Sequence, residues 1–303
     1  MKLPNFLVAG VPKAGTTNLW KNLRQHPDVF LPKVKEPRFF IDAPEGWVRS
    51  KQIGSLDSYR SLFEPATSEA AIGEVSPGYF SSRKAPDRIR ETLGHPKIIL
   101  VLRNPVERAF SHFVFSLRKG LEPDMATFES AIENETVRVG DSVRHRPYVN
   151  IGFYYQHLQR WTSIFNRNSI KLLFFEDLKD DEVAFTQRVY DFLGVDDSFE
   201  PDIGVKYAKS GIPRSRRLHS ALTEAGRLRM RLKRWCPDWI LDVLRDLFDP
   251  FRAKLKNWNL DKPELPDRQY RELAEQYRSD VHQLENETER NLSHWLEPSS
   301  RPQ

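Results

Sequence analysis

The sequence predicts an α/β fold in which a central sheet of parallel strands is covered by helices on both faces. Three apolar runs carry this prediction: "NFLVAG" from Asn5, "KIILVLR" from Lys97 and "IKLLFFEDL" from Ile170. None of the runs alternates between polar and apolar residues, as expected for strands buried on both faces. Each run is followed by a segment of helical character, and this repeated order is typical of a doubly wound sheet.

The helical segments are predicted from apolar residues at helical spacing. After the first strand, Leu19 and Leu23 lie four residues apart. After the third, Phe185 and Val189 belong to an apolar stripe, and Gly194 is expected to end that helix because glycine readily adopts the left-handed backbone. The full set of expected helices is 16–27, 104–120, 154–165, 181–195 and a charged helical tail over 266–296.

Length and composition indicate one domain. The chain has 303 residues, a net charge of +5 and a single cysteine, so no intramolecular disulfide can form. We expect a single domain over 1–303, with a core of about 4–205 and a helical cap with C-terminal helices over about 206–298. The mild charge gives no reason to expect nucleic-acid binding. No apolar stretch approaches 18 residues, and we expect a cytoplasmic protein.

The segment "GVPKAGTT" after the first strand is close to the nucleotide-binding loop G-x-x-x-x-G-K-[ST]. Gly10 and Gly15 keep the glycine spacing, but Lys13 lies inside the loop instead of after the second glycine. A loop between strand and helix offers backbone N–H groups and the positive end of the helix to an anion, and Thr16 and Thr17 add hydroxyl groups that cap the helix or donate to phosphate. The displaced lysine favours a phosphate that carries one transferable group, bound without metal. The fold is therefore expected to be P-loop-like.

Two motifs resemble those of sulfotransferases that use 3′-phosphoadenosine 5′-phosphosulfate (PAPS). "PKAGTT" resembles the family's 5′-phosphosulfate loop, and "LRNPVERAFSHF" resembles its 3′-phosphate motif. The arginine of the second motif also suits a phosphate on physical grounds, because it ends a strand at the edge where open α/β sheets bind ligands. The resemblance implies PAPS as co-substrate, the 3′,5′-bisphosphate PAP as product, no metal, and the following binding residues: Lys13, Ala14, Gly15, Thr16, Thr17, Arg103 and Ser111.

A third segment, "PKVKEPRFF", resembles the K-E-x-x-F-F motif of heparan-type sulfotransferases. The resemblance implies that Glu36 is the catalytic base and that Lys13 stabilises the leaving oxygen. The cationic neighbours of Glu36 are expected to lower its pKa. His112 is the rival base, but it follows Ser111 on a helix and is therefore expected to point about 100° away from it, toward packing or solvent.

The acceptor side is less determined by the sequence. The resemblance implies that Arg38, Glu74 and Ser76 contact the acceptor, but Val75 stands where heparan enzymes commonly have lysine. A neutral sugar, a glycolipid or a small hydroxylated metabolite is therefore expected in place of a polyanion. The alternatives are a P-loop small-molecule kinase, which Lys13 and Arg103 oppose, and a non-catalytic nucleotide-binding module.

The basic C-terminal third allows two interpretations. "SGIPRSRRL" resembles a loop that closes over PAPS in bacterial sulfotransferases, which implies that Arg214 and Arg216 bind phosphate. A basic surface loop explains the same residues equally well. The segment 227–248 combines cations with apolar residues at helical spacing, so it either contacts an anionic membrane surface weakly or packs its apolar side on the domain. The sequence does not decide the oligomeric state.

Overall fold

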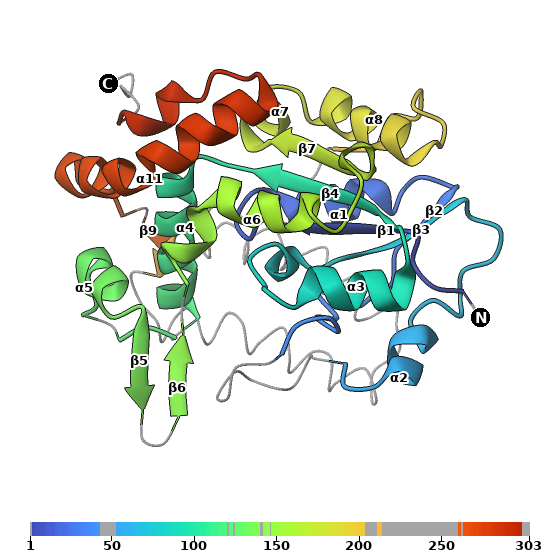
Figure 1. The fold of residues 1–303 in the computed structure, drawn as a ribbon, viewed down its shortest axis with the longest axis horizontal. Helices are drawn as coiled ribbons and strands as arrows, with labels where there is room; N and C mark the ends of the chain where they lie inside the picture. Colours follow the sequence, from blue (N-terminus) through green and yellow to red (C-terminus); the bar gives the residue numbers. More distant parts are fainter. Residues whose placement is uncertain are drawn as a thin grey trace, which may run out of the picture. The chain divides into compact units, whose positions relative to one another are not determined.

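Five parallel strands form the central sheet in the order β2-β3-β1-β4-β7 (Figure 1). In this computed structural model the described residues are 2–42, 53–119, 121–123, 125–139, 142–145, 147–203, 211–213, 260–261 and 263–298. The strands of the sheet are β1 (Phe6–Gly10), β2 (Val29–Phe30), β3 (Ala71–Val75), β4 (Lys97–Leu102) and β7 (Ile170–Phe174). Two short antiparallel pairs lie outside it: β5 (Thr136–Val139) with β6 (Ser142–His145), and β8 (Ile212–Pro213) with β9 (Leu260–Asp261).

Helices connect these strands. The α-helices are α1 (Thr16–Leu23), α2 (Leu56–Ser61), α3 (Ala85–Leu93), α4 (Pro105–Arg118), α5 (Phe128–Glu133), α6 (Tyr154–Thr162), α7 (Phe175–Asp180), α8 (Glu182–Leu193) and α11 (Asp267–Thr288). The 3-10 turns are η2 (Pro77–Tyr79), η3 (Asn150–Gly152), η4 (Arg167–Ser169) and η5 (Ser293–Leu296). No helix among the described residues is long and apolar enough to cross a bilayer.

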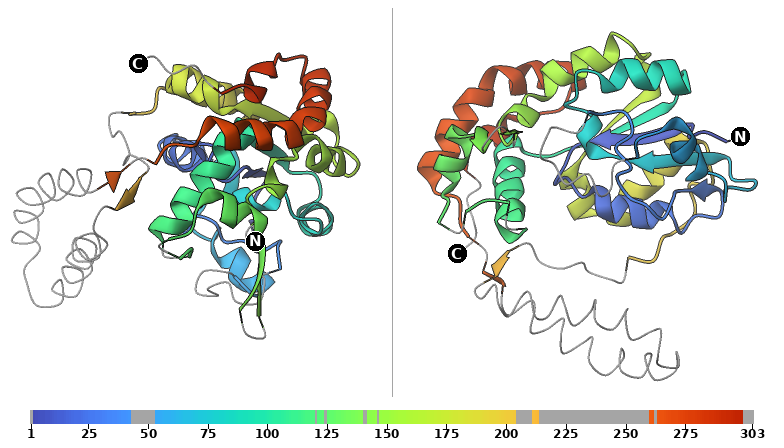
Figure 2. Two further views of the ribbon diagram at one scale, coloured as in Figure 1. Left: turned by 90° about the vertical axis from the view of Figure 1, so that its left-hand side faces the viewer. Right: turned by 90° about the horizontal axis from the view of Figure 1, so that it is seen from below.

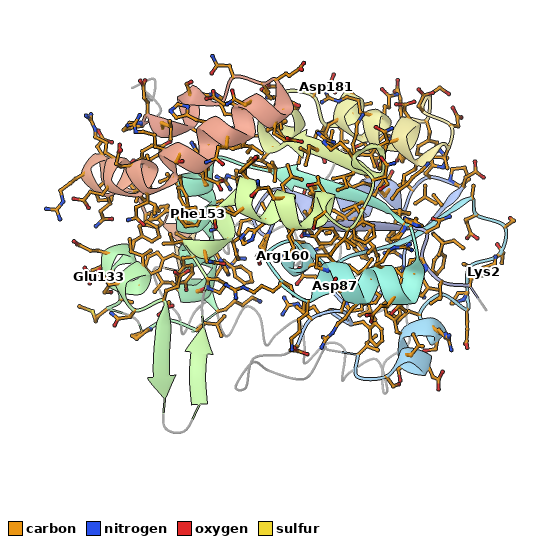
Figure 3. All side chains as sticks on the ribbon, in the orientation of Figure 1. Lys2, Asp87, Glu133, Phe153, Arg160 and Asp181 are labelled. Carbon is orange, nitrogen blue, oxygen red and sulfur yellow. The ribbon has the colours of Figure 1, made fainter. Side chains whose placement is uncertain are left out.

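Helices cover both faces of the sheet (Figure 2). On one face α1 packs on α8, where Asn22 donates to Glu182 and accepts from Tyr190 through its backbone carbonyl. On the other face lie α3 and α6, and the indole of Trp161 donates to the carbonyl of Phe80 just after the sheet. Buried apolar side chains fill both interfaces, since every residue of β1 and β3 is buried. Asp181 caps α8 by accepting a hydrogen bond from Ala184 N (Figure 3).

The predicted fold class is confirmed, and the sequence located three of the five strands of the central sheet. All three predicted strands are present, although β7 ends at Phe174 and the residues "FEDL" after it belong to α7. The expected helices are found with shorter ends, and Gly194 follows α8 with a φ of 79°. Strands β2 and β3 were not predicted. Strand β3 was not recognised because Gly73 and the buried Glu74 interrupt its run of apolar residues.

The chain divides into two compact units by its internal contacts. The first comprises 1–112, 128–205 and 266–303, and contains the five-stranded sheet. The second comprises 113–127 and 206–265, most of which lies outside the described residues. The expectation of one domain with a cap starting near residue 206 stays a prediction. All site residues discussed below belong to the first unit.

Candidate active site

The glycine loop leaves β1 at the centre of the sheet. Strand β1 is paired with β3 on one side and β4 on the other, so chain connections diverge there, and open α/β sheets bind ligands at the carboxyl ends of strands at such a point. Val11 N donates to Val101 O of β4 at 2.9 Å, which fixes the start of the loop. Lys13 and Gly15 both have left-handed φ, 73° and 78°. A side chain at Gly15 would also meet Leu178 at 2.3 Å, so only glycine fits.

The N-terminus of α1 is arranged for an anion. Gly15 occupies the N-cap and brings no side-chain acceptor, and the first turn contains no acidic residue. The helix end therefore keeps donors and a positive potential for a ligand. Thr16 is buried, Thr17 is exposed and Ala14 is fully buried. The expectation that a threonine caps this helix is wrong, because the helix begins at Thr16 and Gly15 precedes it.

Arg103 follows β4 at the same edge of the sheet. Its Nη1 donates to Lys13 O and its Nη2 to Glu107 Oε2, both at 3.0 Å. The guanidinium lies 4.7 Å from the centre of the Phe175 ring, a stacking contact that sequence reasoning missed. Its Nε is buried and has no hydrogen-bond partner. The structure thus joins the predicted 3′-phosphate arginine to the predicted phosphosulfate loop and leaves one donor for a ligand.

Helix α4 presents Ser111 two turns after its start. Asn104 caps the helix, because its Oδ1 accepts from the backbone N–H groups of Val106 and Glu107 at 3.0 and 3.1 Å. Its amide also donates to Tyr270 Oη at 2.7 Å, which ties the cap to α11. Ser111 is half-buried on this fixed helix. Its role at the 3′-phosphate stays a prediction.

Glu36 lies in a loop between two cations. Its carboxylate accepts from Lys35 Nζ at 2.9 Å and from Arg38 Nη2 at 2.5 Å, while its side chain stays 31% exposed. Burial raises the pKa of Glu36, but Lys35 and Arg38 outweigh burial and hold the pKa below its usual value. Glu36 and Arg38 have φ of 61° and 56°, conformations that are costly for these residues and that cluster at functional sites.

The loop of Glu36 is anchored to the end of β3. Glu36 N donates to Val75 O at 3.0 Å, and Arg38 N donates to Ser76 Oγ at 3.3 Å. Next along the loop, Phe39 stacks on Tyr59 with ring centres 4.5 Å apart, and Phe40 is buried beside it. These anchors hold the strained backbone and explain why two aromatic residues follow the glutamate.

Glu74 supports this loop from inside the protein. It is 0% exposed; Tyr59 and Tyr79 donate to one carboxylate oxygen at 2.8 and 2.9 Å, and Ser76 donates to the other at 2.8 Å. Burial raises the pKa of Glu74 to about 7, although the three hydroxyl donors oppose the rise. The expectation that Glu74 contacts the acceptor therefore needs correction. Glu74 positions Ser76, and Ser76 in turn holds Arg38.

His112 packs against Tyr148, with ring centres 5.0 Å apart, which agrees with the expected packing role, but charged groups of the predicted site also act on it. Burial lowers the pKa of His112 to about 3, and the charges of Arg108, Lys13 and Arg38 lower it further, while Glu36 opposes them. The imidazole therefore lies within electrostatic reach of the predicted base and the predicted leaving-group cation. The angle from Ser111 alone gave no sign of these charges. Arg108, one turn earlier on the same face, was the available signal.

Two other predicted regions cannot be placed. Arg214 and Arg216 lie outside the described residues, as does the segment 227–248. Among the residues that are described, no group of three or more metal-ligating side chains is present, and the absence of a metal requirement stays a prediction.

Sequence comparison decides the family. The sulfotransferase domain matches residues 3–210, which contain the glycine loop, the Glu36 loop, Arg103 and Ser111. The chain belongs to the sulfotransferase domain family. Human heparan sulfate glucosamine 3-O-sulfotransferase 3B1 is 34% identical over 198 residues, covering 64% of this chain and 47% of that protein. The membrane-associated sulfotransferase kil1 of Dictyostelium discoideum is 34% identical over 154 residues, covering 48% of this chain and 31% of that protein.

A solved structure extends the likeness beyond the matched domain. The sulfotransferase from Alicyclobacillus acidocaldarius superposes with a TM-score of 0.71 at 25% identity, covering 97% of this chain and 99% of that chain. The predicted membership of the sulfotransferase family is confirmed by these matches. This chain spans about half the length of the curated heparan sulfate glucosamine 3-O-sulfotransferases that it matches.

Proposed function

We propose that this sulfotransferase moves the sulfuryl group of PAPS to a hydroxyl group of a carbohydrate or glycolipid. The observation that carries the proposal is the convergence of three elements at one edge of the sheet. The phosphate-type loop leaves β1, Arg103 leaves β4 and is bonded to Lys13, and the Glu36 loop is bonded to the end of β3. Relatives named as heparan sulfate sulfotransferases support a sugar acceptor.

The residues at this edge fit a nucleotide with phosphates at both ends of its ribose. The uncapped start of α1 and the loop from Gly10 to Gly15 suit the 5′ side, since backbone N–H groups there face no side-chain acceptor. The buried, unpartnered Nε of Arg103 suits a 3′-phosphate, because a buried donor without an acceptor is costly. Ser111 adds a hydroxyl group on the adjoining helix.

The chemistry follows from the charges of the protein groups. When bound, PAPS supplies a sulfuryl group joined to a phosphate leaving group. Glu36 accepts the proton of the acceptor hydroxyl as that oxygen forms its bond to sulfur, and Lys13 stabilises the negative charge on the oxygen that departs. Lys35 and Arg38 keep Glu36 ionised and oriented. The carboxylate is therefore in the form that accepts a proton, but its lowered pKa makes it a weak base. Holding the groups in line supplies much of the remaining rate enhancement.

The acceptor is proposed to carry less charge than heparan sulfate. Val75 is buried at the end of β3, so this position offers neither a cation nor an exposed side chain to a polyanionic sugar. A small hydroxylated metabolite is the second candidate, favoured by the same observation. A cytoplasmic location and a membrane contact through 227–248 stay proposals, supported only by the sequence.

Glu36→Gln tests the function and its mechanism together. Glutamine preserves size and hydrogen bonding but cannot take the acceptor proton, so transfer from PAPS to an oligosaccharide should fall by about 10²–10⁴-fold. Affinity for PAP, measured by calorimetry, should stay within a few-fold of the wild type. Neutral and N-sulfated oligosaccharides of equal length should be compared as acceptors, and the neutral one is expected to have the higher kcat/KM. Full transfer activity in the Glu36→Gln variant would refute the assigned base.

A further inference from the structure

His112 packs on Tyr148, and Arg108, its neighbour on α4, bonds to the same tyrosine. Arg108 and His112 are four residues apart and therefore share one face of the helix. Arg108, which is fully buried, donates through Nη2 to Tyr148 O. The imidazole of His112 meets the Tyr148 ring edge-on, with centres 5.0 Å apart. Both contacts fix the ring, so its position follows from the packing of α4 on the segment before α6.

The surroundings of this ring are those of the proposed reaction. The charged groups that act on His112 are Arg108 on its own helix, Lys13 in the glycine loop, and Arg38 and Glu36 in the loop after β2. Three are cations and one is the proposed base. A second proton on the ring would add a fourth positive charge to this cluster, so His112 stays neutral and is unsuited to act as the base.

One ring nitrogen has no assigned partner. Nδ1 of His112 is buried and makes no hydrogen bond, whereas most buried polar groups in proteins are paired. A buried N–H without an acceptor is costly, and nearby cations favour an unprotonated nitrogen with its lone pair. The single proton of the neutral ring is therefore best placed on Nε2. That tautomer makes His112 a hydrogen-bond donor beside Glu36 and Lys13.

We propose that His112 is an acceptor-positioning residue whose Nε2–H donates a hydrogen bond to the oxygen of the acceptor hydroxyl, while the hydroxyl proton points to Glu36. The inference rests on the proposed function and adds a specificity-determining contact to it. His112 neither gains nor loses a proton: the hydroxyl proton passes to Glu36, and the oxygen uses its remaining lone pair to form the bond to sulfur. Orientation of this kind lowers the barrier by holding the nucleophile in line.

Two substitutions separate this role from packing. His112→Phe keeps the edge-on ring contact with Tyr148 but has no N–H, and His112→Asn keeps a donor without the ring. His157→Asn is the matched control. The pKa of His157 is also lowered, to about 4, but its Nε2 bonds to Asn150 O and its charged neighbours are Arg160, Arg108 and Arg83. Transfer to a neutral oligosaccharide and transfer to water would be measured for all variants, together with PAP affinity and melting temperature.

We expect the loss of the Nε2–H donor to weaken the use of the acceptor hydroxyl and to leave nucleotide binding unchanged. His112→Phe should raise KM for the oligosaccharide and lower kcat/KM about 10–100-fold, as for a lost orienting hydrogen bond, with unchanged PAP affinity. His112→Asn should recover most of the loss, and His157→Asn should change neither KM nor kcat. In ¹⁵N spectra His112 should be the neutral Nε2–H tautomer from pH 5 to 9, and adding the sugar to the PAP complex should shift that N–H signal.

Several results would overturn the assignment. If His112→Phe keeps wild-type kinetics, His112 has only a packing role. If the variant loses PAP affinity, His112 contacts the nucleotide instead of the acceptor. A ring that titrates near neutral pH, with His112→Asn as inactive as His112→Phe, would make it the base. The failure of the proposed function is distinct from all of these: the wild-type protein would then transfer sulfuryl to neither sugar nor water.

Discussion

Glu74 should make the stability of the protein fall as the pH rises through neutrality. Its pKa in the folded protein is about 7, against 4.5 for an ordinary glutamate, because it is buried among Tyr59, Tyr79 and Ser76. Between these values the folded state holds a proton that the unfolded chain has released, so raising the pH favours unfolding. The stabilising effect is complete below the unfolded pKa and is lost as the pH passes the folded pKa.

The magnitude follows from the displacement of the pKa. One pKa unit is worth about 1.4 kcal/mol, so the contribution of Glu74 is about 3 kcal/mol in full and about 2–3 kcal/mol between pH 5 and pH 8. Glu74→Gln stays neutral and keeps a similar shape. Its free energy of unfolding relative to the wild type should therefore rise by that amount between pH 5 and pH 8, measured by urea denaturation at both values.

A second substitution tests the cause of the shift. Tyr59 donates to the ionised carboxylate at 2.8 Å, and this hydrogen bond lowers the pKa of Glu74. Tyr59→Phe removes the donor, so the pKa should rise further and the wild-type loss of stability with pH should extend to higher pH. If Glu74→Gln and the wild type lose stability in parallel between pH 5 and pH 8, the carboxyl is not held protonated by burial and the reasoning fails.

Two further predictions concern the charges of the site. Lys13→Met removes the loop cation but keeps its length; kcat should fall about 10²-fold or more, as for a preorganised charge at a developing anion, and PAP affinity should fall less. Equal losses in both quantities would make Lys13 a binding residue only. Arg38→Gln removes a cation that lowers the pKa of Glu36, so the acid limb of the kcat/KM profile should move to higher pH. Lys35→Gln should move it in the same direction, and an unmoved limb in both variants would show that Glu36 does not control it.

The sequence located the elements of this site whose structure depends on local patterns. The strands β1 and β4 are apolar almost throughout, and the glycine spacing, the two threonines and the preceding strand together identify the loop at the end of β1. Glycine at position 15 is required by a local feature, the left-handed backbone. Family motifs supplied Arg103 and Glu36, and the structure places both at the carboxyl edge of the same sheet.

What the sequence could not show depends on contacts between distant segments. The family resemblance implied that Glu74 contacts the acceptor, and its donors Tyr59 and Tyr79 cannot be recognised without the fold. The stacking of Arg103 on Phe175 joins residues from two different strand ends. His112 was placed by its angle from Ser111 alone, whereas its orientation is set by Tyr148, which lies 36 positions later in the sequence.

Binding of PAP and AMP by calorimetry without Mg²⁺ tests the central claim most directly, because the two ligands differ only in the 3′-phosphate assigned to Arg103 and Ser111. Arg103→Ala should lose about 1.5–3 kcal/mol of PAP binding, the range for a hydrogen bond to a charged group, and little AMP binding. Glu107→Gln is the control, since it breaks the pair with Arg103 at 3.0 Å but keeps the guanidinium. The account predicts that the wild-type protein binds PAP far more tightly than AMP. Equal affinity for the two nucleotides would contradict it.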